Sequence, residues 1–113
     1  MDKEIIRRII RRHIQEVKYC YERELTKKPG LRGTIVVDFT IGQTGQIIAS
    51  TLRGSSLGSP LVETCVVRAV LGWQFPVPLH GAIVFVSYPF GLRPAGDGAS
   101  GNGGGAGGAG GGG

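Results

Sequence analysis

The chain has 113 residues, of which 41% are hydrophobic, and it carries a formal net charge of +5. This length allows one domain and hardly two, with a hydrophobic core that needs no metal to hold it together. No stretch approaches the roughly 18 apolar residues of a membrane-spanning helix, and arginines interrupt the apolar start of the chain, which argues against a signal peptide. We therefore expect a soluble domain, either on its own or as a piece of a longer protein.

Residues 3–25 are expected to form one amphipathic helix, which ends before Pro29 and Gly30. Apolar side chains recur along it at spacings of three and four, at Ile6, Ile10, Ile14, Val17, Tyr21 and Leu25. Basic side chains occupy the opposite side, at Arg7, Arg8, Arg11, Arg12 and Lys18. We interpret this basic side first as a solvated helix face. A contact with phosphate or anionic lipid, and a nucleic-acid interface, are the alternatives.

Two strands joined by a short turn follow this helix. Apolar and more polar side chains alternate over residues 31–41, which predicts a strand with one buried face. Residues 42–45 contain two glycines that suit a tight turn, and a second strand continues from there. Residues 31–54 are therefore expected to form a hairpin.

A second helix, a last strand and a tail complete the chain. Ser59 is expected to cap the helix, with Pro60 at its first position. Residues 82–90 read as the last strand. Thirteen of the 21 glycines lie in the last 23 positions, so residues 93–113 are expected to be a disordered tail.

These elements predict a two-layer α+β domain over residues 1–92, in the order α-β-β-α-β. Two helices would lie on one face of a three-stranded antiparallel sheet, with the first strand in the centre. Pro89 favours an edge position for the last strand, because proline has no backbone N–H to donate to a neighbour. Phe39, Trp73 and Phe75 are the predicted core anchors.

The stretches "GTIVVDFTIGQTGQIIASTLRGSS" and "VVRAVLGWQFPVP" resemble the C-terminal domain of TonB-type proteins. That family has a G-x-V-x-V-x-F-x-I strand, a glycine turn, a second strand ending in S-S and a helix ending in A-V-x-x-W-x-F. The residues that carry the resemblance are Gly33, Ile35, Val37, Phe39, Ile41, Gly45, Ser55, Ser56, Ala69, Val70, Trp73 and Phe75. The opening "IIRRHIQEVKYCYERELTKKPGLRG" is more similar to the TonB-like domains of myxobacterial gliding-motility proteins, and the Y-P dipeptide of many TonB proteins is absent.

The resemblance implies a periplasmic interaction domain of a protein anchored in the inner membrane, with the anchor upstream of Met1. Such domains are not enzymes. They bind an outer-membrane or periplasmic protein through an extended peptide and transmit force from a proton-driven inner-membrane motor. The resemblance implies no cofactor.

The two cysteines, Cys20 and Cys65, lie at the flanks of the two predicted apolar stripes. In an oxidising periplasm they would form a disulfide, and the alternative is two independent small core residues. A zinc site built with His13 and His80 is not expected, because His13 and Cys20 would lie about 10 Å apart along a helix. No catalytic set of residues is recognised.

The predicted partner-binding surface is the last strand, at Ile83, Val84, Phe85, Val86, Ser87 and Tyr88. Large apolar side chains alternate on both of its faces, although only one face can lie under the helices. An edge strand with such a surface invites strand addition by an extended peptide. Self-association into a homodimer through the same edge is the alternative function, and nucleic-acid binding by the basic helix is a more distant one.

Overall fold

The computed structural model describes residues 1–95, and most of the expected tail, residues 96–113, lies outside this part. The described residues form helices, strands and one short 3-10 helix. In chain order they are α1 (Lys3–Arg12), α2 (Ile14–Leu25), β1 (Gly33–Ile41), β2 (Ile47–Ser55), α3 (Pro60–Leu71), η1 (Leu79–Gly81) and β3 (Val84–Leu92).

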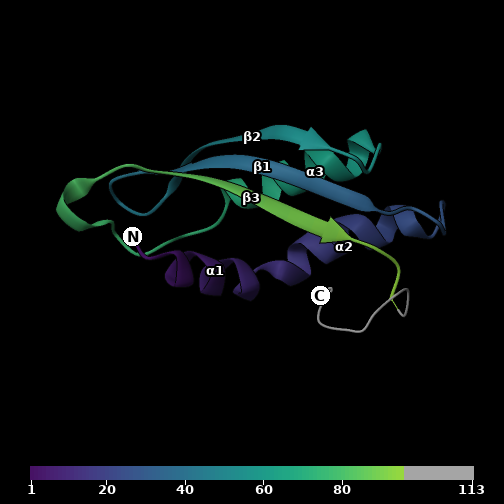
Figure 1. The fold of residues 1–113 in the computed structure, drawn as a ribbon, viewed down its shortest axis with the longest axis horizontal. Coiled ribbons are helices and arrows are strands. Elements are labelled where there is room, and N and C mark those ends of the chain that lie inside the picture. The colour runs from purple at the N-terminus through teal and green to yellow at the C-terminus, as the bar shows by residue number, and fades with distance from the viewer. Residues whose placement is uncertain (96–113) are drawn as a thin grey trace.

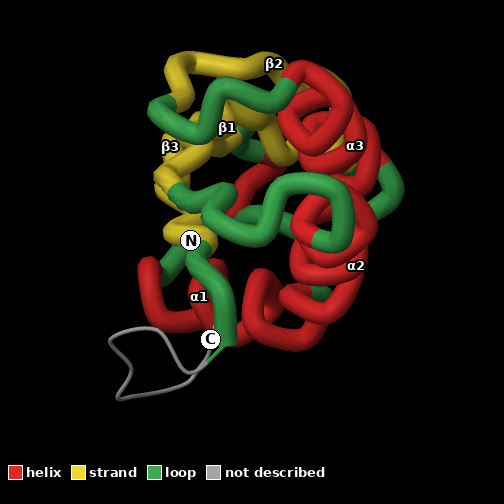
Figure 2. The backbone as a smooth tube through the Cα atoms, turned by 90° about the vertical axis from the view of Figure 1, so that its right-hand side faces the viewer, coloured by secondary structure: helices red, strands yellow, loops and turns green. Residues whose placement is uncertain are grey.

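The domain has the predicted α+β architecture of a sheet covered on one face by helices. The sheet has the strand order β2-β1-β3, and both pairs are antiparallel, so β1 is central as expected. Figure 1 shows α3 behind the sheet, and Figure 2 shows α2 and α3 side by side on the same side of it. In both views α1 lies next to β3, at the margin of the helical layer.

The opening segment is two helices rather than the single helix expected over residues 3–25. His13 ends α1 and begins α2, with φ −105° and ψ 3°. Its N–H donates to the carbonyl oxygen of Ile10, three residues back, so the regular α-helical hydrogen bonding is interrupted there. The break directs α1 along β3, while α2 packs beside α3. A helical period in the sequence cannot reveal such a break, because both halves keep the same spacing of apolar residues.

The second helix begins as predicted. The Ser59 side chain accepts a hydrogen bond from the N–H of Val62 (3.4 Å), and Pro60 is the first helical residue. Ser59 thus supplies an acceptor for an N–H that would otherwise be unpaired at the start of the helix. Pro60 has a fixed φ that already suits a helix. The buried stripe of α3 consists of Val62, Val66 and Val70.

The sheet buries one face, and its strand ends differ slightly from the expected ones. On β1 the side chains of Ile35, Val37, Phe39 and Ile41 are buried, in strict alternation. This strand begins at Gly33 rather than at residue 31. The last strand spans residues 84–92 rather than 82–90, because β3 pairs with β1 in an unbroken register from Val84 opposite Ile41 to Leu92 opposite Gly33. Ile83 therefore precedes the strand.

Aromatic side chains fill the core between the sheet and the helices. The predicted anchors Phe39, Trp73 and Phe75 are each only 2% exposed. The ring centroids of Phe39 and Phe75 lie 5.8 Å apart, and those of Trp73 and Phe90 lie 6.2 Å apart with the two rings nearly perpendicular. These contacts join the sheet to the segment that follows α3.

Candidate functional site

The outer edge of β3 presents unpaired backbone groups. The N–H of Ser56 donates to the carbonyl oxygen of Thr34 (2.9 Å), so the backbone of Thr34 faces β2. Backbone groups alternate in direction along a strand, so those of Val36 also face β2. The residue opposite Val36 on β3 is Pro89, whose backbone is therefore turned away from β1. Proline suits this position, where it has no ladder hydrogen bond to make.

The same alternation divides the predicted edge residues into two sets. Val84, Val86 and Tyr88 turn their backbone groups to β1, whereas Phe85 and Ser87 turn theirs to the free edge. The side chains divide in the same way: Val84, Val86 and Tyr88 are half-buried on the helical face, and Phe85 and Ser87 are exposed on the outer face. Phe85 is 80% exposed, and Ile83, just before the strand, is 47% exposed. Backbone donors and an apolar surface are thus found together at this edge.

The opposite edge of the sheet, β2, is less regular. The pairing of β1 with β2 shifts register twice, which leaves Arg53 and Ile48 as extra residues on β2. Such bulges interrupt the row of backbone groups and twist the edge, which hinders pairing with another strand. Ser50 also donates its hydroxyl hydrogen to the carbonyl oxygen of Val67 on α3 (2.9 Å), so part of β2 is tied to the helical layer. Of the two edges, β3 is the one suited to pairing.

A carboxylate lies on the outer face beside the β3 edge. Asp38 on β1 stands opposite Ser87, and its Oδ2 accepts a hydrogen bond from Arg53 (3.1 Å). Its Oδ1 is shielded from solvent and receives no hydrogen bond of good geometry. The Ser87 hydroxyl, helped by the Arg53 guanidinium, holds the pKa of the Asp38 carboxyl below its usual value, although partial desolvation acts in the opposite direction. Asp38 is therefore ionised at neutral pH.

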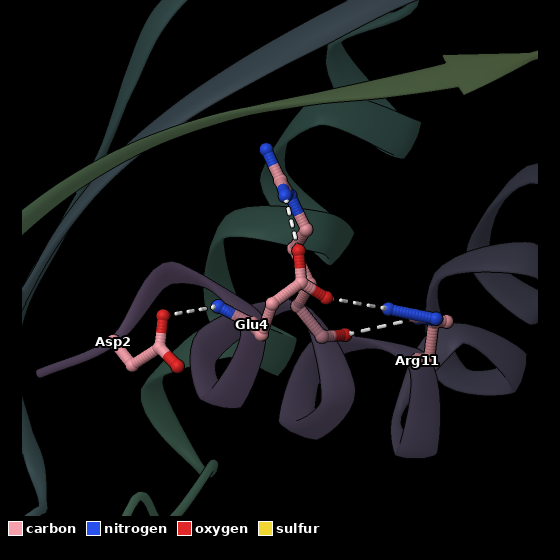
Figure 3. A network of polar contacts seen from close by, with 4 residues as sticks. Asp2, Glu4 and Arg11 are labelled. Atoms are coloured by element: carbon pink, nitrogen blue, oxygen red, sulfur yellow. Dashed lines mark hydrogen bonds and ion pairs between the residues drawn. The ribbon is translucent and has the colours of Figure 1, made fainter.

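The basic side of α1 is only partly neutralised. Asp2 accepts a hydrogen bond from the N–H of Glu4 (3.2 Å) and so caps the helix. The Glu4 carboxylate lies 2.7 Å from the Arg7 guanidinium and 3.9 Å from that of Arg11, and Figure 3 shows Glu4 between Asp2 and Arg11. All three side chains are more than half exposed, which makes such pairs weak. This arrangement fits a solvated helix face.

A disulfide joins α2 to α3, as predicted for the two cysteines. Cys20 and Cys65 are bonded, with their Cα atoms 5.7 Å apart. Cys20 is buried and Cys65 is half-buried, at the boundary between the core and the surface. The Arg23 guanidinium donates to the sulfur of Cys65 (3.4 Å).

The two histidines of the described residues lie in different surroundings. His13 lies 2.8 Å from a carboxylate oxygen of Glu16, and its ring stacks on Trp73 with 4.9 Å between centroids. His80 lies in η1 with a φ of 58°. Within residues 1–95 no group of three or more His, Cys, Asp or Glu side chains is placed to hold a metal ion. No helix in this range is long and apolar enough to cross a membrane.

Two features of the surface escaped the sequence analysis. Glu16 accepts a hydrogen bond from the indole N–H of Trp73 (3.0 Å), which locks the start of α2 to the end of α3. A shallow groove runs between the same two helices, lined by Gln15, Glu16, Tyr19, Cys20, Cys65, Arg68 and Ala69. No local pattern signals either feature, because the residues involved are about fifty positions apart.

No family model matches the chain, and neither a curated protein nor a solved structure matches it.

Proposed function

We propose that this domain binds an extended segment of a partner protein by strand addition at the edge of β3. The observation that carries the proposal is the outward orientation of the backbone groups of Phe85 and Ser87 on a strand without bulges. An added peptide would gain main-chain hydrogen bonds at these two residues. Its side chains would gain apolar contact with Phe85 on the outer face.

The limits of the edge set the length and position of the bound segment. Pro89 has no N–H to offer at the free edge, so pairing weakens toward the end of β3. The bound segment is therefore centred on Phe85 and Ser87, with Ile83 at one end. In both views α1 runs next to β3 on the side away from β1, so the bound segment would lie between β3 and α1 or against α1 (Figures 1 and 2).

The biological setting that we propose follows from the resemblance to TonB C-terminal domains. In that setting the domain is periplasmic, belongs to an inner-membrane-anchored protein, and transmits force to an outer-membrane or periplasmic partner, as in a gliding-motility machine. The disulfide supports this setting, because such bonds persist in oxidising compartments and are rare in the cytosol. The domain's role is then interaction and not catalysis.

The test is an NMR titration of the full chain with synthetic peptides from the periplasm-facing segments of outer-membrane proteins of the same genome. We expect a dissociation constant in the micromolar range, about −8 kcal/mol. Binding should slow hydrogen exchange at the amides of Phe85 and Ser87. The amides of Val86 and Tyr88, already paired with β1, should be protected both with and without peptide.

A pair of substitutions at one position separates backbone pairing from side-chain contact. Ser87→Pro removes the outward N–H, and Pro89 shows that this side of β3 accepts proline. It should weaken binding roughly tenfold or more, whereas Ser87→Ala, which keeps the N–H, should bind like the wild type. Equal binding by both variants would refute strand addition. Protection of Phe85 and Ser87 that rises with protein concentration alone would instead assign the edge to a homodimer.

A further inference from the structure

The groove between α2 and α3 is a second surface, separate from the β3 edge. The two helices pack side by side on the sheet (Figure 2), and the Cys20–Cys65 disulfide connects them, with both cysteines lining the groove. Their buried stripes, which include Val17, Val62 and Val66, face the sheet. The groove therefore opens on the other side of the helical layer, toward solvent.

The walls of the groove offer apolar surface to a ligand. Tyr19 on α2 is 62% exposed although it lines the groove. Ala69 and the two disulfide-bonded cysteines also line the groove. Leu61, which is 66% exposed, lies beyond the lining residues, one turn before Cys65 on α3. A ligand that contacts Tyr19 and also reaches Leu61 would bury apolar surface that is now largely exposed, and such burial favours binding.

The charges available in the groove are positive. Arg68 lines it, and the Arg23 guanidinium lies 5.1 Å from the centre of the Tyr19 ring. Among the described residues neither arginine has a carboxylate partner within ion-pair distance. Glu16, the one acidic residue lining the groove, already accepts a hydrogen bond from Trp73 and contacts His13 through its other oxygen. Arg23 also donates a hydrogen bond to the Cys65 sulfur (3.4 Å), but sulfur is a weak acceptor and the guanidinium has further N–H donors. Both carboxylate oxygens of Glu16, in contrast, are engaged.

We propose that this groove binds an acidic peptide segment of a partner protein, with carboxylates that pair with Arg23 and Arg68 around an apolar side chain seated against Tyr19 and the disulfide. The matching of charge selects an acidic ligand, and arginine is well suited to bidentate pairing with carboxylates. The apolar lining, which includes Tyr19 and Ala69, favours a peptide over a free anion. A nucleic-acid strand is less well matched, because stacking platforms combine several aromatic rings along a basic track and Tyr19 is the one aromatic ring that lines this groove.

The experiment is an NMR titration of the full chain with a short blocked peptide in which Glu-Glu-Leu repeats flank a phenylalanine. Its counterpart has lysine in place of each glutamate. We expect the acidic peptide to shift amide signals at Tyr19, Cys20, Cys65 and Arg68, with a dissociation constant of roughly 100 µM. The lysine peptide should not shift them. Equal binding of the two peptides, or no shifts at these residues, would overturn the proposal.

Two charge reversals test the site directly. Arg68→Glu should weaken binding of the acidic peptide roughly tenfold. Arg8→Glu is the control, because it makes an equal change of charge at an exposed position on α1, and it should weaken binding less than about twofold. Equal losses would show nonspecific attraction to a basic protein and would contradict the proposal. Tyr19→Ala should also weaken binding, and Tyr19→Phe should preserve it. All three positions are exposed, so unchanged melting temperatures of the four variants would show that the fold is intact.

Other occupants of the groove and the β3 edge give distinct results. Shifts at the groove with phosphatidylglycerol vesicles, together with no response to the acidic peptide, would assign the surface to a membrane and overturn the proposal. Shifts that depend on protein concentration would assign it to a second copy and would overturn it as well. Ser87→Pro should leave groove binding unchanged, so failure at β3 and failure at the groove are distinguishable.

Discussion

Gly45 shows how closely the turn between β1 and β2 is fitted to the segment after α3. Its φ is +86°, a region that favours glycine. Its carbonyl oxygen accepts a hydrogen bond from the N–H of Phe75 (2.9 Å), and the Gln74 side chain donates to the carbonyl oxygen of Thr44 (3.0 Å). A Cβ atom at Gly45 would lie 2.0 Å from the carbonyl oxygen of Phe75, which leaves no room for a side chain.

Gly45→Ala should therefore lower the free energy of unfolding by about 3 kcal/mol or more, from backbone strain and from the clash with Phe75 together. Gly58→Ala is the matched control, because Gly58 also has a positive φ, +73°, but nothing lies within 4 Å of an added Cβ. This control substitution should lower the free energy of unfolding by about 1–2 kcal/mol, from backbone strain alone. Urea unfolding followed by circular dichroism measures the free energy of unfolding of each variant. Equal losses in the two variants would show that the turn does not pack against Phe75 as described.

At the scale of elements, the helical layer is held together where α2 meets α3. The Cys20–Cys65 disulfide links the middle of the two helices, and the hydrogen bond from Trp73 to Glu16 links one end. The His13 break between α1 and α2 lies beside the same tryptophan, whose ring stacks on the imidazole. The position of α2 is thus determined by its contacts with α3 and with the residues after it.

Removal of the disulfide should have a large effect on a domain of this size. The bond joins residues 45 positions apart, and the chain-entropy estimate for such a loop is about 4 kcal/mol, an upper figure. Cys20→Ala combined with Cys65→Ala should lower the free energy of unfolding by up to about this amount. Wild-type protein reduced with a phosphine should lose a similar amount. A loss of less than about 1 kcal/mol in both experiments would mean that the helix pair is held mainly by packing.

At the scale of the whole molecule, Trp73 lies where the structural units meet. It directly follows α3, and its indole N–H donates a hydrogen bond to Glu16 on α2. Its ring stacks on the imidazole of His13, between α1 and α2, and contacts Phe90 on β3. Because it is the only tryptophan in the chain, its fluorescence reports on the sheet and the helical layer at once. It is 2% exposed, so unfolding should shift its emission to longer wavelength.

The domain is therefore expected to unfold in one cooperative transition. Urea titrations followed by tryptophan fluorescence and by far-ultraviolet circular dichroism should give the same midpoint, as for most single domains of this size. An earlier change in circular dichroism than in fluorescence would show that α1, at the margin of the helical layer, separates first. Gly45→Ala should move both midpoints together, since Phe75 and Trp73 belong to the same segment.

Local patterns in the sequence predicted most of the elements and their faces. The alternation on residues 35–41 and the cap at Ser59 with Pro60 depend on neighbours in the chain, and both occur as expected. The central place of β1 and the edge place of β3 followed from the order of the elements and from Pro89. Part of the candidate site was accessible in the same way, since the exposed Phe85 is a consequence of alternation along one strand.

Only the tertiary structure decided the break at His13, the bulges at Ile48 and Arg53, and the groove between α2 and α3. Each of these depends on side chains that meet from distant parts of the chain, such as Glu16 and Trp73, and local propensity carries no information on such contacts. The sequence by itself determined which residues are apolar, which strand carries proline and that two cysteines are present. The packing of the helices on the sheet decided which backbone groups stay unpaired, that the two cysteines bond, and where two arginines lie without carboxylate partners.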